Sequence, residues 1–128
     1  MGDGFIRTLP ADAWDGSVGG NLYYPMASCW RDLYLYPGEI EIRIYAHGTP
    51  ARSEWPEMRV NLGNDILATL SVTSRDPEPY VLPVNIGRTG KRRLEITFLN
   101  DYFLESPNID RNLRIEQAEI RYLRIDWP

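Results

Sequence analysis

The sequence predicts an all-β domain in which antiparallel strands form a sandwich or a barrel. The first observation is the segment EIEIRIY at residues 39–45, where Ile40, Ile42 and Ile44 share one face. This period of two is typical of a half-buried strand. The second observation is that similar segments recur at a spacing of about ten residues, as in sandwiches and barrels. The third is that turn signals separate these segments.

The other expected strands have the same composition of β-branched, aromatic and aliphatic residues. They span residues 30–36, 58–62, 66–72, 80–86 and 94–99. Pro37-Gly38, Gly63-Asn64, Asp76-Pro77 and the two glycines of residues 87–90 mark the breaks between them. Glycine and proline supply the dihedral angles that turns require, so these pairs predict chain reversals.

The two ends of the chain differ in pattern. Residues 1–25 are rich in Gly and Asp and predict a loop-rich N-terminal arm with one edge strand. In residues 113–125, Leu113 and Ile115 have one parity, whereas Ala118 and Ile120 have the other. A β-bulge near Gln117 reconciles the two halves, because an extra residue in one strand changes the face to which later residues belong.

Size and charge narrow the class of protein. The chain has 128 residues and 43% apolar residues, so we expect one folded domain over residues 1–128. The net charge of −4 argues against nucleic acid as a partner, since phosphate binding needs a basic surface. No apolar run approaches the roughly 20 residues of a membrane span, and no signal peptide is visible at the N-terminus.

The sequence offers little for catalysis, and we expect a protein that is not an enzyme. His47 is the sole histidine, no G-x-S-x-G motif is present, and we interpret His47 as a turn or surface residue. Cys29 is the only cysteine, which excludes an internal disulfide and predicts a buried small side chain. The basic run GRTGKRRL, residues 87–94, predicts a solvated hairpin tip.

Residues 98–116, FLNDYFLESPNIDRNLRIE, gather oxygen-bearing side chains, and Arg111 is the single cation among residues 100–112. Crowded carboxylates resist burial unless a cation compensates them, and Ca²⁺ takes roughly 6–8 oxygen ligands. The run therefore indicates a calcium site, and a polar, solvated connection between strands is the alternative. The oxygen-bearing residues are Asn100, Asp101, Glu105, Asn108, Asp110 and Asn112.

An EF-hand does not explain this run. Asn108, Asp110 and Asn112 fit loop positions 1, 3 and 5, and Glu119 fits position 12. Position 6 requires glycine for a sharp turn but is Leu113, and strand-like residues flank the loop.

A second loop points to sugar binding. Residues 46–62, AHGTPARSEWPEMRVNL, join two strands through a proline-stiffened segment that holds Glu54, Trp55 and Glu57. A sugar presents apolar C–H faces that stack on aromatic rings and hydroxyls that need polar partners. The alternative is that Trp55 covers one end of the sandwich.

The two loops together resemble the calcium-dependent xylan-binding carbohydrate-binding modules of family 60, which are related to family 36 by circular permutation. The motifs are YAHGTPA with EWPEM, residues 45–58, and ITFLNDY with DRNL, residues 96–113. The resemblance spans residues 30–122. It implies a jelly-roll β-sandwich without catalytic activity, in which a bound Ca²⁺ is coordinated by two neighbouring hydroxyls of a sugar.

The resemblance also implies roles for individual residues. The calcium ligands would be Asp101 and Asp110, with Asn100, Asn112, the carbonyl of Ile109 and, in the variable insert, Glu105. Trp55, with Glu54 and Glu57, would border the sugar, and Tyr102 would shape the loop. The chain departs from the family where members often read AGGEWPHM, because Arg52, Ser53 and Glu57 make the rim bulkier and more charged.

We therefore expect an extracellular, non-catalytic module that binds xylan or galactan through Ca²⁺. The alternative is a structural protein of the same fold that self-associates through edge strands or the N-terminal arm, with calcium only bracing the loop. A small glycosidase is a third, weaker hypothesis.

Overall fold

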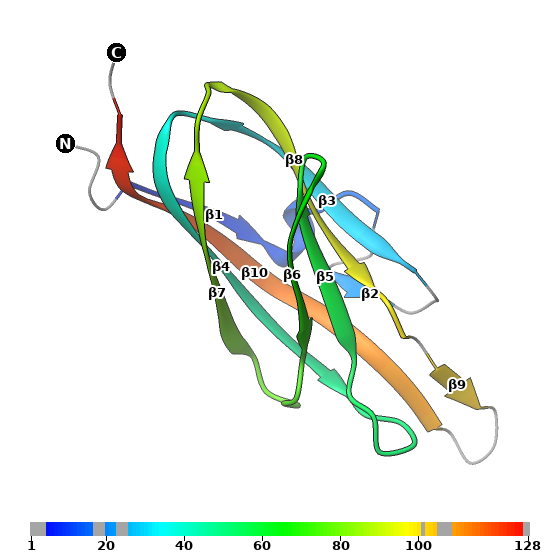
Figure 1. The fold of residues 1–128 in the computed structure, drawn as a ribbon. Helices are drawn as coiled ribbons and strands as arrows, with labels where there is room; N and C mark the ends of the chain where they lie inside the picture. Colours follow the sequence, from blue (N-terminus) through cyan, green and yellow to red (C-terminus); the bar gives the residue numbers. More distant parts are fainter. Residues whose placement is uncertain (1–4, 17–19, 23–25, 101, 105–108, 127–128) are drawn as a thin grey trace.

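The protein is seen here in a computed structural model that describes residues 5–16, 20–22, 26–100, 102–104 and 109–126. Figure 1 shows strands along nearly the whole chain. Within the described ranges, the helical structure is one short 3-10 turn, η1 (Ala11–Ala13), and no helix is long and apolar enough to cross a membrane. The strands are β1 (Phe5–Pro10), β2 (Asn21–Leu22), β3 (Ser28–Leu35), β4 (Gly38–Thr49), β5 (Glu57–Leu62), β6 (Asp65–Ser71), β7 (Glu78–Ile86), β8 (Gly90–Phe98), β9 (Tyr102–Leu104) and β10 (Ile109–Ile125).

The strands form two antiparallel sheets that pack face to face (Figure 1). One sheet has the order β1-β10-β4-β7, with β2 and β9 also paired to β10, and the other has the order β3-β8-β5-β6. The order differs from the sequence order, so that several connections cross from one sheet to the other, as in jelly rolls. The predicted fold class, an antiparallel β-sandwich, is confirmed.

The core lies between the inner faces of the sheets. Ile40, Ile42 and Ile44 of β4 are fully buried, as the alternation of EIEIRIY predicts. Leu94, Ile96 and Phe98 of β8 face them from the second sheet and are also fully buried. Burying one such side chain stabilises the fold by about 1.5–3 kcal/mol, so this double layer is the main source of stability.

The long strand β10 contains the predicted bulge. Its register against β4 shifts between Ile115 and Gln117, and a second shift lies between Tyr122 and Arg124. Ile115 and Ala118 are both fully buried although their positions differ by three, which an unbroken period of two does not allow. The bulge therefore lets β10 bury apolar residues on both sides of Gln117.

The basic run is not a hairpin tip, and that prediction is wrong. Residues 87–89 join β7 to β8, and these two strands belong to different sheets. Gly and charged residues mark a solvated turn whether the next strand pairs with the last one or crosses the sandwich. The paired turn of the second sheet is instead at Gly63-Asn64, between β5 and β6.

The N-terminal segment contributes to the core as well as to an edge. Strand β1 pairs with β10 from Phe5 to Pro10, and Leu9 and Trp14 are buried. Cys29 in β3 is fully buried, which confirms its predicted burial. Burial raises the pKa of the Cys29 thiol to about 12, so the thiol stays protonated and unreactive at neutral pH.

Candidate functional site

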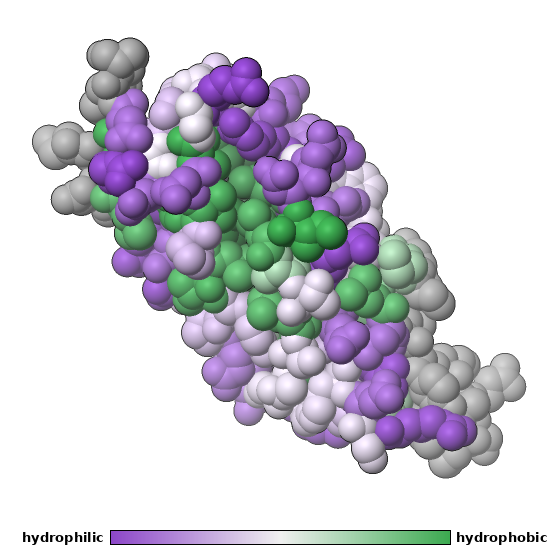
Figure 2. All heavy atoms as spheres, in the orientation of Figure 1, coloured by the Kyte–Doolittle hydropathy of each residue, from purple (hydrophilic) through white to green (hydrophobic). Residues whose placement is uncertain are grey.

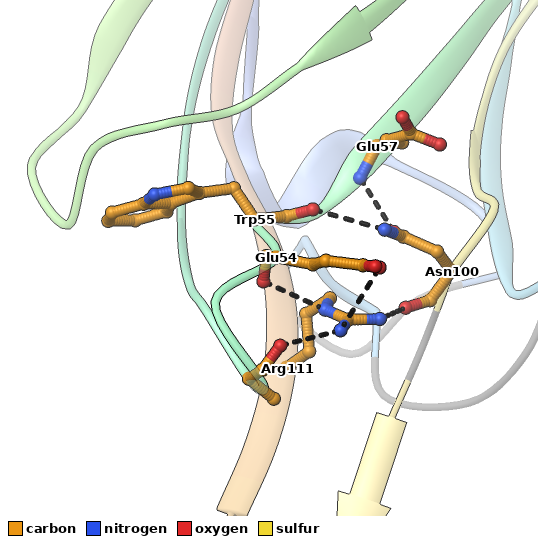
Figure 3. Close-up of polar contacts among 6 residues, drawn as sticks. Glu54, Trp55, Glu57, Asn100 and Arg111 are labelled. Carbon is orange, nitrogen blue, oxygen red and sulfur yellow. Dashed lines mark hydrogen bonds and ion pairs between the residues drawn. The ribbon is translucent and has the colours of Figure 1, made fainter.

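Arg111, in β10, is the centre of the end of the sandwich where the two predicted loops meet. The whole residue is only 5% exposed. It donates hydrogen bonds to three backbone carbonyls: Ala51 at 2.7 Å, Glu54 at 3.0 Å and Asn100 at 2.5 Å (Figure 3). The guanidinium thus ties the loop between β4 and β5 to the end of β8, using the fork geometry that lysine lacks.

Asn100 reinforces the same connection. Its side-chain Oδ1 accepts the backbone N–H of Glu57 at 2.7 Å, and its Nδ2 donates to the carbonyl of Trp55 at 3.0 Å (Figure 3). The backbone N–H of Leu99 also donates to the carbonyl of Glu57. The segment after β8 is therefore joined to the loop by side chains and backbone together.

The loop between β4 and β5 contains a tight turn at Ala51–Glu54. The backbones of Ala51 and Glu54 exchange two hydrogen bonds, 2.9 and 3.0 Å. The two central residues, Arg52 and Ser53, have φ of +51° and +65°. Both are in the left-handed region that side chains with a Cβ disfavour by about 1–2 kcal/mol per residue. Because Arg111 holds the carbonyls at both ends of this turn, tertiary contacts maintain the strained conformation.

The predicted metal ligands lie in and around the β9–β10 hairpin. Asp101 and Glu105 fall outside the described residues. Ile109 and Asp110 are in β10, where Asp110 pairs with Phe103 of β9, and Tyr102 pairs with Arg111. The structure describes the backbone of these strand residues. Asn100 precedes Asp101 and Arg111 follows Asp110. The hydrogen bond from the Arg111 guanidinium to the Asn100 carbonyl therefore joins the residues next to these two acids.

Asn112 follows Arg111 in β10 and is half-buried. Its backbone N–H donates to Thr49 Oγ1 at 3.1 Å. Over the described residues, no group of three or more His, Cys, Asp or Glu side chains converges on one point. The calcium ligands therefore stay a prediction. The candidate donors are all carboxylate, amide and carbonyl oxygens, and that donor set fits a hard cation such as Ca²⁺.

The predicted sugar-contacting residues surround the same loop. Trp55 is half-buried, and Figure 3 shows its indole ring directed away from Arg111 and Asn100. Glu54 is exposed, and its carboxylate lies 3.5 Å from the Arg111 guanidinium. Glu57 is exposed as well, and its carboxylate is directed away from Arg111 and Asn100 (Figure 3). The ring of Trp55 is therefore not part of the main core, and its role in sugar binding stays a prediction.

His47 lies in β4 and not in a turn. Its Nε2 is 2.8 Å from Glu116 Oε1, and Arg114 Nε contacts the same oxygen at 2.6 Å. The hydrogen bond from Arg114, and then that from His47, lowers the pKa of Glu116. The histidine is thus part of a charged group on the outer face of the sheet.

Sequence reasoning missed the role of Arg111. The available signal was that Arg111 is the single cation among the oxygen-bearing residues 100–112. In the structure its hydrogen bonds are to backbone carbonyls that lie 11–60 residues away in sequence. These acceptors carry no side-chain pattern, so no motif could reveal them.

Comparisons with known proteins place the chain. A search of curated proteins finds no match. Among solved structures, the chain is similar to the CBM36-1 domain of a multidomain xylanase from the hindgut metagenome of Trinervitermes trinervoides. The identity is 14%, the TM-score is 0.70, and the match covers 94% of this chain and 100% of that one. It is also similar to a carbohydrate-binding module CBM36 in complex with calcium and xylotriose, with 14% identity, a TM-score of 0.62, and coverage of 89% and 98%.

A third similar structure is the C-terminal CBM6 of LamC, a marine laminarinase from Zobellia galactanivorans, with 12% identity, a TM-score of 0.58, and coverage of 91% and 99%. At these identities the structures establish the sandwich fold alone. The sequence profile of CBM60, the Ca-dependent, xylan-binding carbohydrate-binding module, matches residues 41–126. This match includes both candidate loops and confirms the resemblance seen in the sequence. The chain therefore belongs to the CBM60 family of carbohydrate-binding modules.

Proposed function

We propose that this chain is a non-catalytic, extracellular module that binds a xylan-type polysaccharide through a calcium ion at the end of the sandwich built around Arg111. The observation that carries the proposal is the family match over residues 41–126, which covers the Trp55 loop and the β9–β10 hairpin. Arg111 and Asn100 join these two segments through hydrogen bonds, so residues 45 to 57 positions apart in sequence contribute to one surface.

Asp101 and Asp110 would hold the ion, with Asn100, Asn112, the carbonyl of Ile109 and Glu105 as further donors. When bound, Ca²⁺ supplies coordination positions that two adjacent sugar hydroxyls can fill. The role of Arg111 is to position the segments that carry these donors, because its guanidinium holds the backbone of Asn100 and of the Ala51–Glu54 turn. Asn100 Oδ1 already accepts one hydrogen bond, so it would ligate through its second lone pair.

Trp55 would form the apolar side of the sugar site. Its ring is half-buried and projects from a loop whose backbone is fixed by Asn100, which keeps the ring in place before the ligand arrives. Arg52, Ser53 and Glu57 at the rim would determine whether xylan or galactan fits. A ring that is positioned in advance loses little conformational entropy on binding.

Isothermal titration with neutral xylo-oligosaccharides and galacto-oligosaccharides, in calcium and in chelator, tests this function. We expect binding in calcium and none in chelator. Trp55→Ala should abolish sugar binding but keep calcium binding. Tyr34→Ala is the matched control, since Tyr34 is an aromatic residue of β3 with 57% exposure outside the loop. Sugar binding that is indifferent to chelator would remove calcium from the mechanism.

One observation favours the second candidate, self-association through an edge strand. Strand β6 has a single charge, Asp65, no proline, and an Ile66 that is 61% exposed, whereas the neighbouring edge β7 contains Pro79 and Pro83. Figure 2 shows apolar side chains gathered on this flank, where β6 and β7 approach each other. Proline and charge protect edge strands from pairing, and β6 has only its bulge. Sedimentation at several concentrations decides, and a strict monomer would exclude this candidate.

A further inference from the structure

A polar cleft of about 390 Å³ lies beside the loop end, on the outer side of the β10–β4 sheet. That volume falls in the range of small-ligand sites, roughly 300–1,000 Å³. It is formed where β2, the end of β4 and β10 meet the connection between β6 and β7. Its lining residues are Asn21, His47, Gly48, Thr49, Arg75, Asn112, Leu113 and Arg114.

The cleft adjoins the Trp55 loop and has a fixed wall. The backbone N–H of Gly48 donates to the carbonyl of Ser74 at 2.9 Å, which fastens the segment carrying Arg75 against β4. A Cβ at Gly48 would lie 2.4 Å from the carbonyl oxygen of Asn112 and 2.6 Å from Cγ of Pro56, the residue after Trp55. Glycine is therefore required where the cleft, β10 and the Trp55 loop come together.

The charges of the cleft favour an anionic ligand. Arg75 is exposed and, within the described part of the chain, has no carboxylate within ion-pair distance. Arg114 pairs with Glu116, which His47 also contacts, so one carboxylate serves two basic side chains. The acids that follow Arg75, Asp76 and Glu78, do not line the cleft. The lining thus has an excess of positive charge on a protein whose net charge is −4.

The other lining groups suit a sugar. Asn21, Thr49 and Asn112 bring amide and hydroxyl groups that exchange hydrogen bonds with ring hydroxyls. An arginine with an unpaired fork binds a carboxylate through two parallel N–H···O bonds, with more geometric selectivity than a lysine offers. A ligand that combines hydroxyls with one carboxylate matches both features.

We propose that this cleft binds a uronic acid unit of the glycan that the neighbouring loop end binds, with Arg75 as the residue that recognises its carboxylate. The inference rests on the proposed function, because the loop end and the cleft would contact one chain. Acidic xylan, rather than neutral xylan, is then the preferred class of substrate.

The test compares a neutral linear xylo-oligosaccharide with the same oligosaccharide carrying one glucuronic acid branch, by isothermal titration in calcium. We expect the wild-type protein to bind the acidic compound up to about tenfold more tightly, which is the effect of a two-pronged arginine–carboxylate hydrogen bond in a cleft. Arg75→Gln should remove this preference and leave the affinity for the neutral compound unchanged. Arg75→Lys should keep part of it.

The matched control is Arg88→Gln, which removes one exposed positive charge at the opposite end of the sandwich. It should keep the full preference. Equal preference in wild type and Arg75→Gln, or equal loss in both glutamine variants, would overturn the proposal. In a last experiment, inorganic phosphate competes with the acidic compound for the protein at fixed ionic strength. If phosphate displaces it as well as free glucuronate does, the cleft is a general anion site and the uronic acid proposal is wrong.

The outcomes separate this inference from the proposed function. Calcium-dependent binding of the neutral compound without any acidic preference would leave the proposed function intact and reject the uronic acid site. Acidic preference through Arg75 that persists in chelator, with no binding of the neutral compound, would support the cleft and reject the calcium mechanism.

Discussion

The sandwich has two ends, one at β9 and the other where β10 finishes (Figure 1), and different kinds of contact hold them. At the loop end, the buried Arg111 donates three hydrogen bonds to backbone carbonyls. At the opposite end, Arg124 is 54% exposed and pairs with Glu39 at 2.8 Å and Asp126 at 2.7 Å. Buried carbonyls that lose their hydrogen-bond donor cannot bind water instead, whereas exposed charged groups can. The loop end should therefore depend more strongly on Arg111 than the opposite end depends on Arg124.

The opposite end is also held by hydrogen bonds between uncharged groups. The backbone N–H of Tyr36 donates to the hydroxyl of the buried Tyr122 at 2.8 Å, and that of Asp126 donates to the carbonyl of Pro37 at 2.8 Å. These bonds, together with the β4–β10 pairing up to Ile125, hold the β3–β4 connection in place without Arg124. At the loop end, by comparison, one buried arginine makes three of the hydrogen bonds that fix the loop.

The largest expected effect comes from replacing the two arginines. Arg111→Met removes the donors of three carbonyls and should lower the free energy of unfolding by about 3 kcal/mol or more. Arg124→Gln should leave it nearly unchanged. Denaturant unfolding of the two variants measures both, and equal losses would contradict the distinction between the ends. Arg111→Lys, which keeps the charge without the fork, should fall between them.

Calcium should stabilise the loop end of the sandwich and leave the opposite end unchanged. Because a ligand that binds the folded state alone stabilises it, calcium at a hundred times its dissociation constant should add about 2.7 kcal/mol. Asp110→Asn should lose most of this gain in calcium and behave like the parent protein in chelator. Asp126→Asn, the same substitution at the opposite end, should retain it. Thermal melting shows the gain, and hydrogen exchange should place the added protection at the loop end.

The strain at the Ala51–Glu54 turn predicts a stabilising substitution. Ser53→Gly removes a Cβ from a residue at φ +65° and should raise the free energy of unfolding by about 0.5–1 kcal/mol, after the entropy that glycine adds to the unfolded chain. The test is denaturant unfolding against Ser71→Gly, a strand position at which glycine should destabilise. A loss at Ser53 would show that Arg111 does not hold the turn in a strained state.

The smallest effect is a pH dependence at the opposite end. The hydrogen bond from Arg124 lowers the pKa of Asp126 below its ordinary value of 3.8. A lowered folded-state pKa stabilises the fold above the ordinary value, and this stability is lost as the pH falls through the folded-state pKa. Below pH 3.8 the pair should therefore weaken, while the Arg111 hydrogen bonds to carbonyls do not titrate. Acid titration followed by NMR at Tyr36 should show the transition, and Asp126→Asn should abolish it.

Several features of the fold could be predicted from residues alone. The alternation in residues 39–45 fixed the inward face of β4, and the change of parity around Gln117 located the bulge in β10. The motifs EWPEM and DRNL indicated the family that the profile confirms. Local patterns are sufficient here because strand periodicity and turn chemistry act over a few residues.

The site could be predicted only in part. Composition identified the acidic run and the Trp55 loop, but neither the Ala51–Glu54 turn nor the bonds of Asn100 to Trp55 and Glu57 follow from them. The basic run at residues 87–94 was misassigned as a hairpin because a turn signal does not state which sheet receives the next strand. The cleft with Arg75 could not be predicted either, since its lining residues come from segments far apart in the chain.

By itself the sequence determined the long strands, the faces they bury, the bulge and the family, because each depends on the order of neighbouring side chains. Only the tertiary structure decided that Arg111 turns inward to hold carbonyls, that β7 and β8 belong to opposite sheets, and that Arg75 shares a cleft with Arg114. The physical reason is that backbone carbonyls and sheet partners look alike in every sequence, and only the folded arrangement determines which of them a given side chain can reach.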